Sequence, residues 1–193
     1  MTAPSAFALK LAGIAEGQYN TFHLLDEANP TLCSQIKKYW TGISPGFSSC
    51  VSVPWSAVFV SWCVRQAGAT ASEFTFAAAH SVFVQAAIKN AIANTGVFQG
   101  LKISDYGPNV GDIIQNNRNG TTFDYAFATT HKNYQSHSAI VIETGQDATG
   151  LYAMTVGGNE GNSIHRTLVH LTNQGLIKQR PNNPFICVIR TLK

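Results

Sequence analysis

The chain has 193 residues, of which 45% are hydrophobic and 12% are charged, and its formal net charge at pH 7 is +3. This length and apolar content suffice for one folded domain with its own core, and they exclude a disordered chain. Lys37 and Lys38 are the only adjacent basic pair, so no basic stripe indicates a nucleic-acid partner. No uncharged apolar segment is long enough to predict a membrane span.

The first half of the chain is predicted to be helical. Apolar residues at helical spacing predict one helix over about residues 5–25 and a second over 31–40, with a break at Asn29-Pro30. A loop rich in glycine, serine and proline over residues 41–52 leads to a third helix over 54–68. A fourth helix is expected over about residues 76–93, with His80 among its core residues.

The helix expected at residues 54–68 is almost wholly apolar and should lie in the core. Pro54 suits its first turn, and Gly68 suits the left-handed residue after its end. Ser56 stands in the first turn, where free N–H groups and the helix dipole favour negative charge. This makes Ser56 a candidate nucleophile, although serine also commonly caps helices. A capping box is incomplete here, because Phe59 stands where Glu or Gln is needed.

The second half of the chain is predicted to form strands over residues 112–115, 137–144, 151–157, 163–171 and 185–191. The class is therefore α+β, a single domain over 1–193 with a helical part (1–95) and a β-rich part (96–193). The sheet is expected to be antiparallel or a partly closed barrel. The polar and aromatic segment 116–136 is predicted to be a long functional loop, and residues 157–162 a tight β-turn.

Four cysteines are present, without a C-x-x-C pair or zinc-like spacing to the histidines, so no structural zinc site is expected. Cys63 and Cys187 lie in apolar segments and are expected in the core. Cys33 and Cys50 flank a predicted helix, and the sequence leaves open whether they form a disulfide.

The known phosphate-binding, H-E-x-x-H and G-x-S-x-G motifs are absent from the sequence. What remains is Ser56 at a helix start, His137 at a strand start, and Asn159 with Glu160 after the next strand. Residues this far apart can converge to supply the nucleophile, base and orienting group of acyl transfer. Each also has an ordinary structural explanation, as a helix cap, an edge histidine, a turn former and a solvated acid.

Residues 54–62 resemble the P-W-[CS]-A-x-F-x-x-W signature of cell-wall amidases and endopeptidases related to NlpC/P60 and CHAP domains. More closely, the chain resembles the DUF2272 family, through ordered segments at residues 36–40, 54–62, 79–80, 111–112, 136–141 and 156–163. The resemblance implies a papain-like fold, with N-terminal helices and a buried central helix packed on an antiparallel sheet of about five strands. It implies Ser56 as nucleophile, His137 as base and Asn159 as the residue that orients the imidazole.

The NlpC/P60 and CHAP relatives have cysteine where this chain has Ser56. A serine hydroxyl must lose its proton during attack and benefits from a carboxylate behind the histidine. Glu160, Asp124 and Asp112 are the candidate carboxylates. Three explanations remain open: serine is the natural nucleophile, it replaces a cysteine, or this branch has another role.

We therefore expect a peptidoglycan hydrolase, an amidase or endopeptidase that cleaves a cell-wall peptide bond without a metal or organic cofactor. Trp55, His80, Asp124, Tyr125 and Glu160 are expected to contact the substrate, together with the aromatic residues Phe123, Phe127 and Tyr134. One alternative is a non-catalytic wall-binding module. Another is a glycan-cleaving muramidase, which needs two carboxylates. Its candidate acids are Glu16, Glu73, Asp112, Asp124 and Glu160.

The first residues lack a basic region, and Lys10 and Glu16 interrupt the apolar segment that follows, so no classical secretory signal is predicted. A wall-directed enzyme without such a signal would reach the periplasm or cell wall by phage lysis or by a specialised secretion apparatus, as an antibacterial effector or a lysis enzyme. The expected partners are peptidoglycan, an immunity protein that covers the cleft, and a component of the secretion apparatus.

Overall fold

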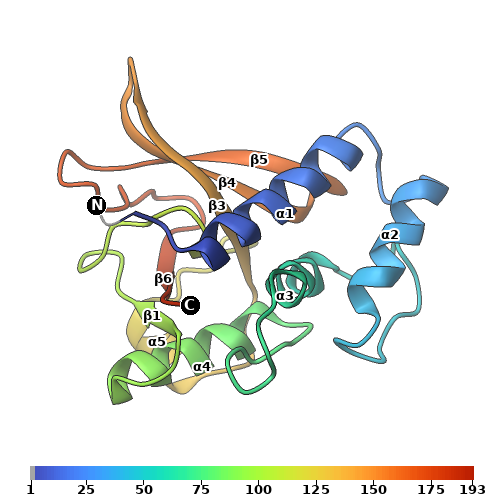
Figure 1. Cartoon of the computed structure of the whole chain (residues 1–193), viewed down its shortest axis with the longest axis horizontal. Coiled ribbons are helices and arrows are strands. Elements are labelled where there is room, and N and C mark those ends of the chain that lie inside the picture. Colours follow the sequence, from blue (N-terminus) through green and yellow to red (C-terminus); the bar gives the residue numbers. More distant parts are fainter. Residues whose placement is uncertain (1–2) are drawn as a thin grey trace.

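The computed structural model describes residues 3–193 and confirms the α+β class (Figure 1). Its helices are α1 (Ala6–Phe22), α2 (Pro30–Trp40), α3 (Ser56–Ala67), α4 (His80–Ala93) and α5 (Tyr125–Thr130). Its strands are β1 (Phe98–Leu101), β2 (Ile113–Asn117), β3 (Ser136–Asp147), β4 (Gly150–Glu160), β5 (Ser163–His170) and β6 (Phe185–Thr191).

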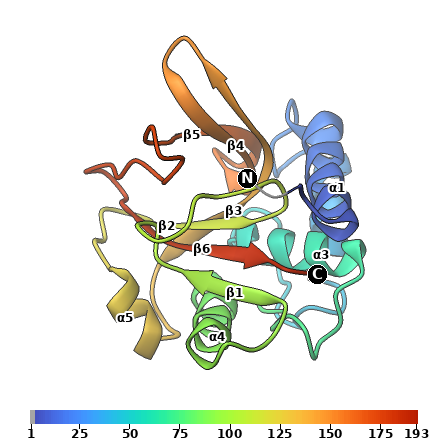
Figure 2. The same ribbon diagram turned by 60° about the vertical axis from the view of Figure 1, so that its left-hand side comes forward.

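The strands form one six-stranded antiparallel sheet in the order β1-β6-β2-β3-β4-β5. Strands β2 to β5 pair in chain order, β2 with β3 across a long connection that contains α5, and β3, β4 and β5 through short turns, whereas β6 returns from the end of the chain to lie between β1 and β2. The hairpin of β3 and β4 projects beyond the rest of the sheet (Figure 2). The expectation of about five strands was one strand short, because β1 is only four residues long and carries no clear alternation.

The two faces of the sheet bury different sets of side chains. Ile113 of β2 packs with the helices in the larger core, whereas the next residue, Ile114, packs with Val141 and Val188 on the other face. This alternation follows from the pleat, which turns successive side chains to opposite faces. Helices α1, α3 and α4 contact the first face. The second face is covered by the loops that carry Tyr106 and Ile177.

Helix α3 lies at the centre of the larger core and contacts α1, α2, β3 and β4. It begins at Ser56, two residues after Pro54, and ends before Gly68, whose φ of 110° is the left-handed conformation expected there. On β4, Gly158 lets the helix approach closely, because a Cβ atom there would lie 2.7 Å from ring atoms of Phe59 and Trp55. The start of α3 is therefore fixed against the end of β4.

Helix α4 begins at His80 and not at residue 76, so His80 is the first residue of the helix, and it is buried as expected. The Ser61 hydroxyl donates to the carbonyl of Ala77 and accepts from its N–H, which holds this approach segment outside the helix. Two further expectations were wrong in detail: segment 116–136 contains α5, and residues 157–160 belong to β4.

A disulfide joins Cys33 of α2 to Cys50 in the loop before α3. The bond closes a loop with a sequence separation of 17 residues. We expect reduction to lower the free energy of unfolding by about 3 kcal/mol, because the unfolded chain gains conformational freedom. Urea unfolding with and without reductant checks this. A Cys33→Ala/Cys50→Ala variant should not respond to reductant, and equal stability of the two redox states of the natural chain would contradict the prediction.

None of the helices between residues 3 and 193 combines the length and the apolar character that a membrane crossing requires.

Candidate functional site

Ser56 and His80 meet at the first turns of two helices. The Ser56 Oγ atom lies 2.7 Å from the His80 Nε2 atom, and the two residues are only 3% and 5% exposed. Ser56 is the first residue of α3 and His80 the first residue of α4, so the chain brings the two helix N-termini together. The contact lies at the wall of a cleft of about 330 Å³ that Tyr134 and Arg118 also line.

The protonation of His80 follows from its surroundings. Burial lowers the pKa of its imidazole well below the ordinary value, and the neighbouring charges of His137 and Arg118 lower it further. The Nδ1 atom is buried and has no hydrogen-bond partner among residues 3–193. Because buried N–H groups are rarely left unpaired, the proton of the neutral ring belongs on Nε2. His80 then donates to Ser56 Oγ, and the Ser56 hydroxyl proton is free to turn toward the cleft.

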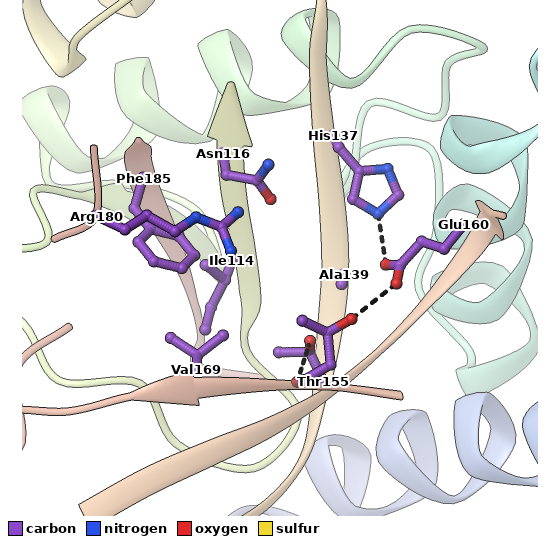
Figure 3. A pocket seen from close by; sticks show the side chains of 10 residues that line it. Ile114, Asn116, His137, Ala139, Thr155, Glu160, Val169, Arg180 and Phe185 are labelled. Atoms are coloured by element: carbon purple, nitrogen blue, oxygen red, sulfur yellow. Dashed lines mark hydrogen bonds and ion pairs between the residues drawn. The ribbon is translucent and has the colours of Figure 1, made fainter. Parts of the chain in front are cut away.

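His137 and Glu160 form a second polar pair next to the first. The His137 Nε2 atom lies 2.8 Å from Glu160 Oε1, and the Thr167 hydroxyl donates to Glu160 Oε2 over 2.9 Å (Figure 3). Burial alone would raise the pKa of Glu160, but the hydrogen bonds from His137 and Thr167 outweigh it, so the pKa is lowered. The ring centroids of His137 and His80 are 5.3 Å apart. The two histidines therefore belong to one site.

Asn159 does not contact His137 in this structure. Its amide donates instead to Glu27 Oε2 over 2.8 Å, and Glu160 takes the position beside the imidazole. The physical reason is a β-bulge in β4, where Asn159 has a left-handed φ of 57° and the register with β5 shifts between Gly158 and Glu160, so that Glu160 faces His137 and Asn159 faces Glu27. The expectation that Asn159 orients His137 is corrected in favour of Glu160, one of the candidate carboxylates.

Glu27 joins the two segments that carry the site. Its Oε2 atom accepts hydrogen bonds from Trp55 Nε1 at 2.9 Å and from Asn159 Nδ2 at 2.8 Å. Trp55 directly precedes Ser56, and Asn159 directly precedes Glu160. Trp55 is fully buried, so it does not line the cleft as expected but anchors the start of α3. Glu27 itself is 6% exposed and was not singled out by any motif in the sequence.

A second cleft, of about 240 Å³, opens over His137 and Glu160. Arg118 lines both this cleft and the one at Ser56, so the two clefts adjoin. Arg180 lines the second cleft and also a small pocket beneath it, whose volume of about 20 Å³ admits one water molecule (Figure 3). The sequence did not indicate that either arginine belongs to the site, because a single charged residue in a loop is part of no periodic pattern.

Two of the expected substrate-binding residues lie elsewhere. Asp124 caps α5 by accepting from the N–H of Phe127, and the Tyr125 hydroxyl donates to the carbonyl of Gly100. Neither residue lines the clefts at Ser56 and His137. Phe123 and Phe127 stack on each other, and Tyr134 alone of the expected aromatic residues borders the Ser56 cleft.

The other candidate acids are engaged outside these two clefts. Asp112 accepts hydrogen bonds from Tyr106, Asn109 and Thr191, and burial raises its pKa to about 6. Glu16 pairs with Arg166 and Glu73 with Lys193. Only Glu160 among the acids weighed for a muramidase lines the clefts at Ser56 and His137. The part of the chain that the structure describes holds no cluster of three or more residues suited to a metal ion.

The matched region of a known family covers every residue of this site. Residues 24–187 match DUF2272, a family described as uncharacterized protein conserved in bacteria. The chain belongs to the DUF2272 family. Comparison with curated proteins and with solved structures gave no match. The DUF2272 region begins just before Glu27 and extends into β6, so it includes both helix starts and the strands that carry His137 and Glu160.

The buried neutral His80 makes stability depend on pH. Because the unfolded state binds a proton near pH 6.5 and the folded His80 does so only at lower pH, stability should fall as pH decreases below about 6.5, by up to about 1.4 kcal/mol per pH unit. Asp112 acts in the opposite direction between about pH 4 and 6, because its folded pKa is raised. Urea unfolding of the natural chain and of His80→Gln at several pH values separates the contribution of His80 to stability from that of Asp112. The natural chain should lose stability relative to the variant as the pH falls, and parallel curves would contradict the assignment.

Proposed function

We propose that this protein is a peptidoglycan hydrolase that cleaves an amide bond of the cell-wall peptides by transferring the acyl group first to Ser56 and then to water. The observation that carries the proposal is the hydrogen bond between Ser56 Oγ and His80 Nε2 at the start of a buried helix, beside the His137–Glu160 pair. The similarity of residues 54–62 to the NlpC/P60 and CHAP signature supports a cell-wall substrate and a papain-like arrangement of helix and sheet.

In the proposed mechanism, His137 is the base. Its Nε2 atom is bonded to Glu160, so Nδ1 is the nitrogen left to take a proton. A carboxylate behind an imidazole stabilises the imidazolium that forms during attack. His80 lacks such a partner, and its burial and the nearby charge of Arg118 disfavour the imidazolium, which makes it a poor proton acceptor. Its role is to hold Ser56 Oγ by donating a hydrogen bond.

The reaction then proceeds in two balanced steps. Ser56 Oγ attacks the amide carbon as its proton passes to His137, and His137 returns that proton to the leaving amine. Water then attacks the acyl ester, with His137 again as base, and releases the carboxylic acid and free Ser56. The hydrogen bond from Phe59 N–H to the Trp55 carbonyl is the first one within α3. The N–H groups of Ser56 and Ala57 come before it in the chain, so they are available to bind the oxyanion.

The setting of the reaction is part of the same proposal. The Cys33–Cys50 disulfide supports action in an oxidising compartment, such as the periplasm or the outer side of the membrane. We therefore keep the wall-directed roles, an antibacterial effector or a lysis enzyme, with peptidoglycan as substrate and an immunity protein or secretion-apparatus component as partner.

Mass spectrometry of purified peptidoglycan after incubation tests the proposal. The natural chain should release new amine ends, Ser56→Ala should release none, and the matched control Ser52→Ala, at an exposed serine, should behave as the natural chain. Activity of Ser56→Cys above that of the natural chain would identify position 56 as a site better suited to a thiol. Cleavage that survives Ser56→Ala would refute the mechanism. Reducing sugar ends would indicate a muramidase, and saturable binding without products would indicate a binding module.

A further inference from the structure

Two arginines line the cleft above His137 without a carboxylate of their own. Arg118 and Arg180 both border the cleft of about 240 Å³, whose acidic residue is Glu160. Both Glu160 oxygens are already occupied, Oε1 by His137 and Oε2 by Thr167. The ion pairs within residues 3–193 include neither arginine. The charge of Glu160 acts on Arg180, but one carboxylate balances only one of the two arginines, so these three side chains leave the cleft with a net positive charge.

Arg180 is held in place for binding. Its Nε atom donates to the carbonyl of Asn183 over 3.1 Å, and its guanidinium carbon lies 4.4 Å from the centre of the Phe185 ring. These contacts leave its two terminal amino groups for a ligand, and Figure 3 shows the guanidinium beside Asn116, across the pocket from His137 and Glu160. A planar guanidinium fixed in this way binds a carboxylate through two parallel hydrogen bonds.

Arg118 extends the positive charge toward the nucleophile. It lines the cleft at Ser56 as well as the one at His137, and its charge contributes to the environment of His80. A ligand that crosses from one cleft to the other must pass this residue. An anionic group held between the two arginines would thus lie next to an amide positioned at Ser56.

We propose that the cleft between Arg118 and Arg180 binds a carboxylate of the substrate, so that the protein selects peptides with a free carboxylate close to the scissile amide. This rests on the proposed function for the position of the cut bond, but the recognition of the carboxylate stands on the cleft alone. Cell-wall stem peptides carry both internal and terminal carboxylates, and the test below distinguishes these two sources.

Calorimetric titration of the Ser56→Ala protein, which lacks the proposed nucleophile, provides the test. The probes are a synthetic stem peptide with all carboxylates free and two analogues with either the terminal or the internal carboxylate converted to a carboxamide. One of the analogues should bind about 10- to 100-fold more weakly than the free peptide, as expected for loss of charge-assisted hydrogen bonds. The weaker analogue identifies the carboxylate that is recognised.

Adding Arg180→Gln or Arg118→Gln to the Ser56→Ala background should remove most of this preference, whereas Lys89→Gln, which removes an exposed positive charge on α4 away from both clefts, should keep it. Equal binding of all three peptides, absence of binding at millimolar concentration, or a preference that survives both arginine substitutions would overturn the proposal.

Incubation of the natural chain with the same peptides separates the carboxylate-binding cleft from the proposed hydrolase function. A carboxylate preference without cleavage would refute the proposed function alone, and cleavage without a preference would refute the carboxylate cleft alone.

Discussion

Replacing His137 with glutamine is expected to lower the rate of peptidoglycan hydrolysis about 1,000- to 10,000-fold, the loss typical of removing a member of a catalytic triad. The same replacement at His80 should lower the rate about 10-fold or less, because a glutamine amide can still donate a hydrogen bond to Ser56 Oγ. The two histidines lie with ring centroids 5.3 Å apart, so the comparison assigns the base between neighbouring residues.

The larger loss of rate expected for His137 than for His80 follows from the hydrogen-bond partners of the two imidazole rings. His137 has Glu160 behind it at 2.8 Å, and that carboxylate stabilises the positive charge which a general base acquires. His80 is 5% exposed, and its Nδ1 atom has no partner in the described part of the chain, so a proton transferred to it would leave a buried and unpaired charge. A hydrogen-bond donor at His80 needs no such stabilisation.

Initial rates of amine release by equal amounts of folded protein provide the measurement, and His170→Gln, at an exposed histidine on β5, is the matched control. The pattern of losses decides between the histidines. A loss at His80→Gln as large as that at His137→Gln would make His80 the base, in keeping with its contact to Ser56. Equal small losses would exclude both histidines from proton transfer.

Replacing Glu27 with alanine is expected to lower the free energy of unfolding by about 3 kcal/mol, because a buried and a half-buried donor lose their acceptor at once. These donors are Trp55 Nε1 and Asn159 Nδ2, which both bond to Glu27 Oε2. Glu27→Gln should cost less, about 1 to 2 kcal/mol, because its amide oxygen can still accept from both donors. Urea unfolding gives the values.

Activity should follow the same order as stability at temperatures where all variants are folded. Glu27 connects the residues that precede Ser56 and Glu160, so its loss loosens both halves of the site without removing a reacting group. The exposed Asp105→Ala variant is the control for loss of a negative charge. If Glu27→Ala is as stable as Asp105→Ala, the buried network has no structural importance.

The parts of the fold that rest on local patterns were predictable. Strand β6 was predicted at residues 185–191 and is observed there, because a short apolar and β-branched segment between loops has few alternatives. The central helix was predicted from its apolar residues and from Gly68 at its end. Strand β1 escaped prediction because its pairing with β6 depends on residues about ninety positions away in the sequence, and no local pattern records such a partner.

The site was predictable in its residues more than in their contacts. Ser56, His137 and Glu160 were all singled out, but the sequence could not tell which of Asn159 and Glu160 faces the imidazole, since that depends on the β-bulge at Asn159 in β4. The helix that carries His80 was predicted to begin at about residue 76, four residues too early, because nothing in the sequence indicates that Ser61 holds the preceding segment outside the helix. Glu27 has no local signal at all, since its partners are brought to it by the tertiary fold.

The position of β6 inside the sheet has a consequence for the order in which the protein folds during synthesis. Strands β2 to β5 are neighbours in sequence and can pair as soon as they leave the ribosome, which brings His137 and Glu160 together early. Strand β1 must wait for β6, the last strand to be translated, before it has a partner. Helix α4, which begins at His80, makes most of its strand contacts with β1. We therefore expect the contact between Ser56 and His80 to be completed only when nearly the whole chain has been made.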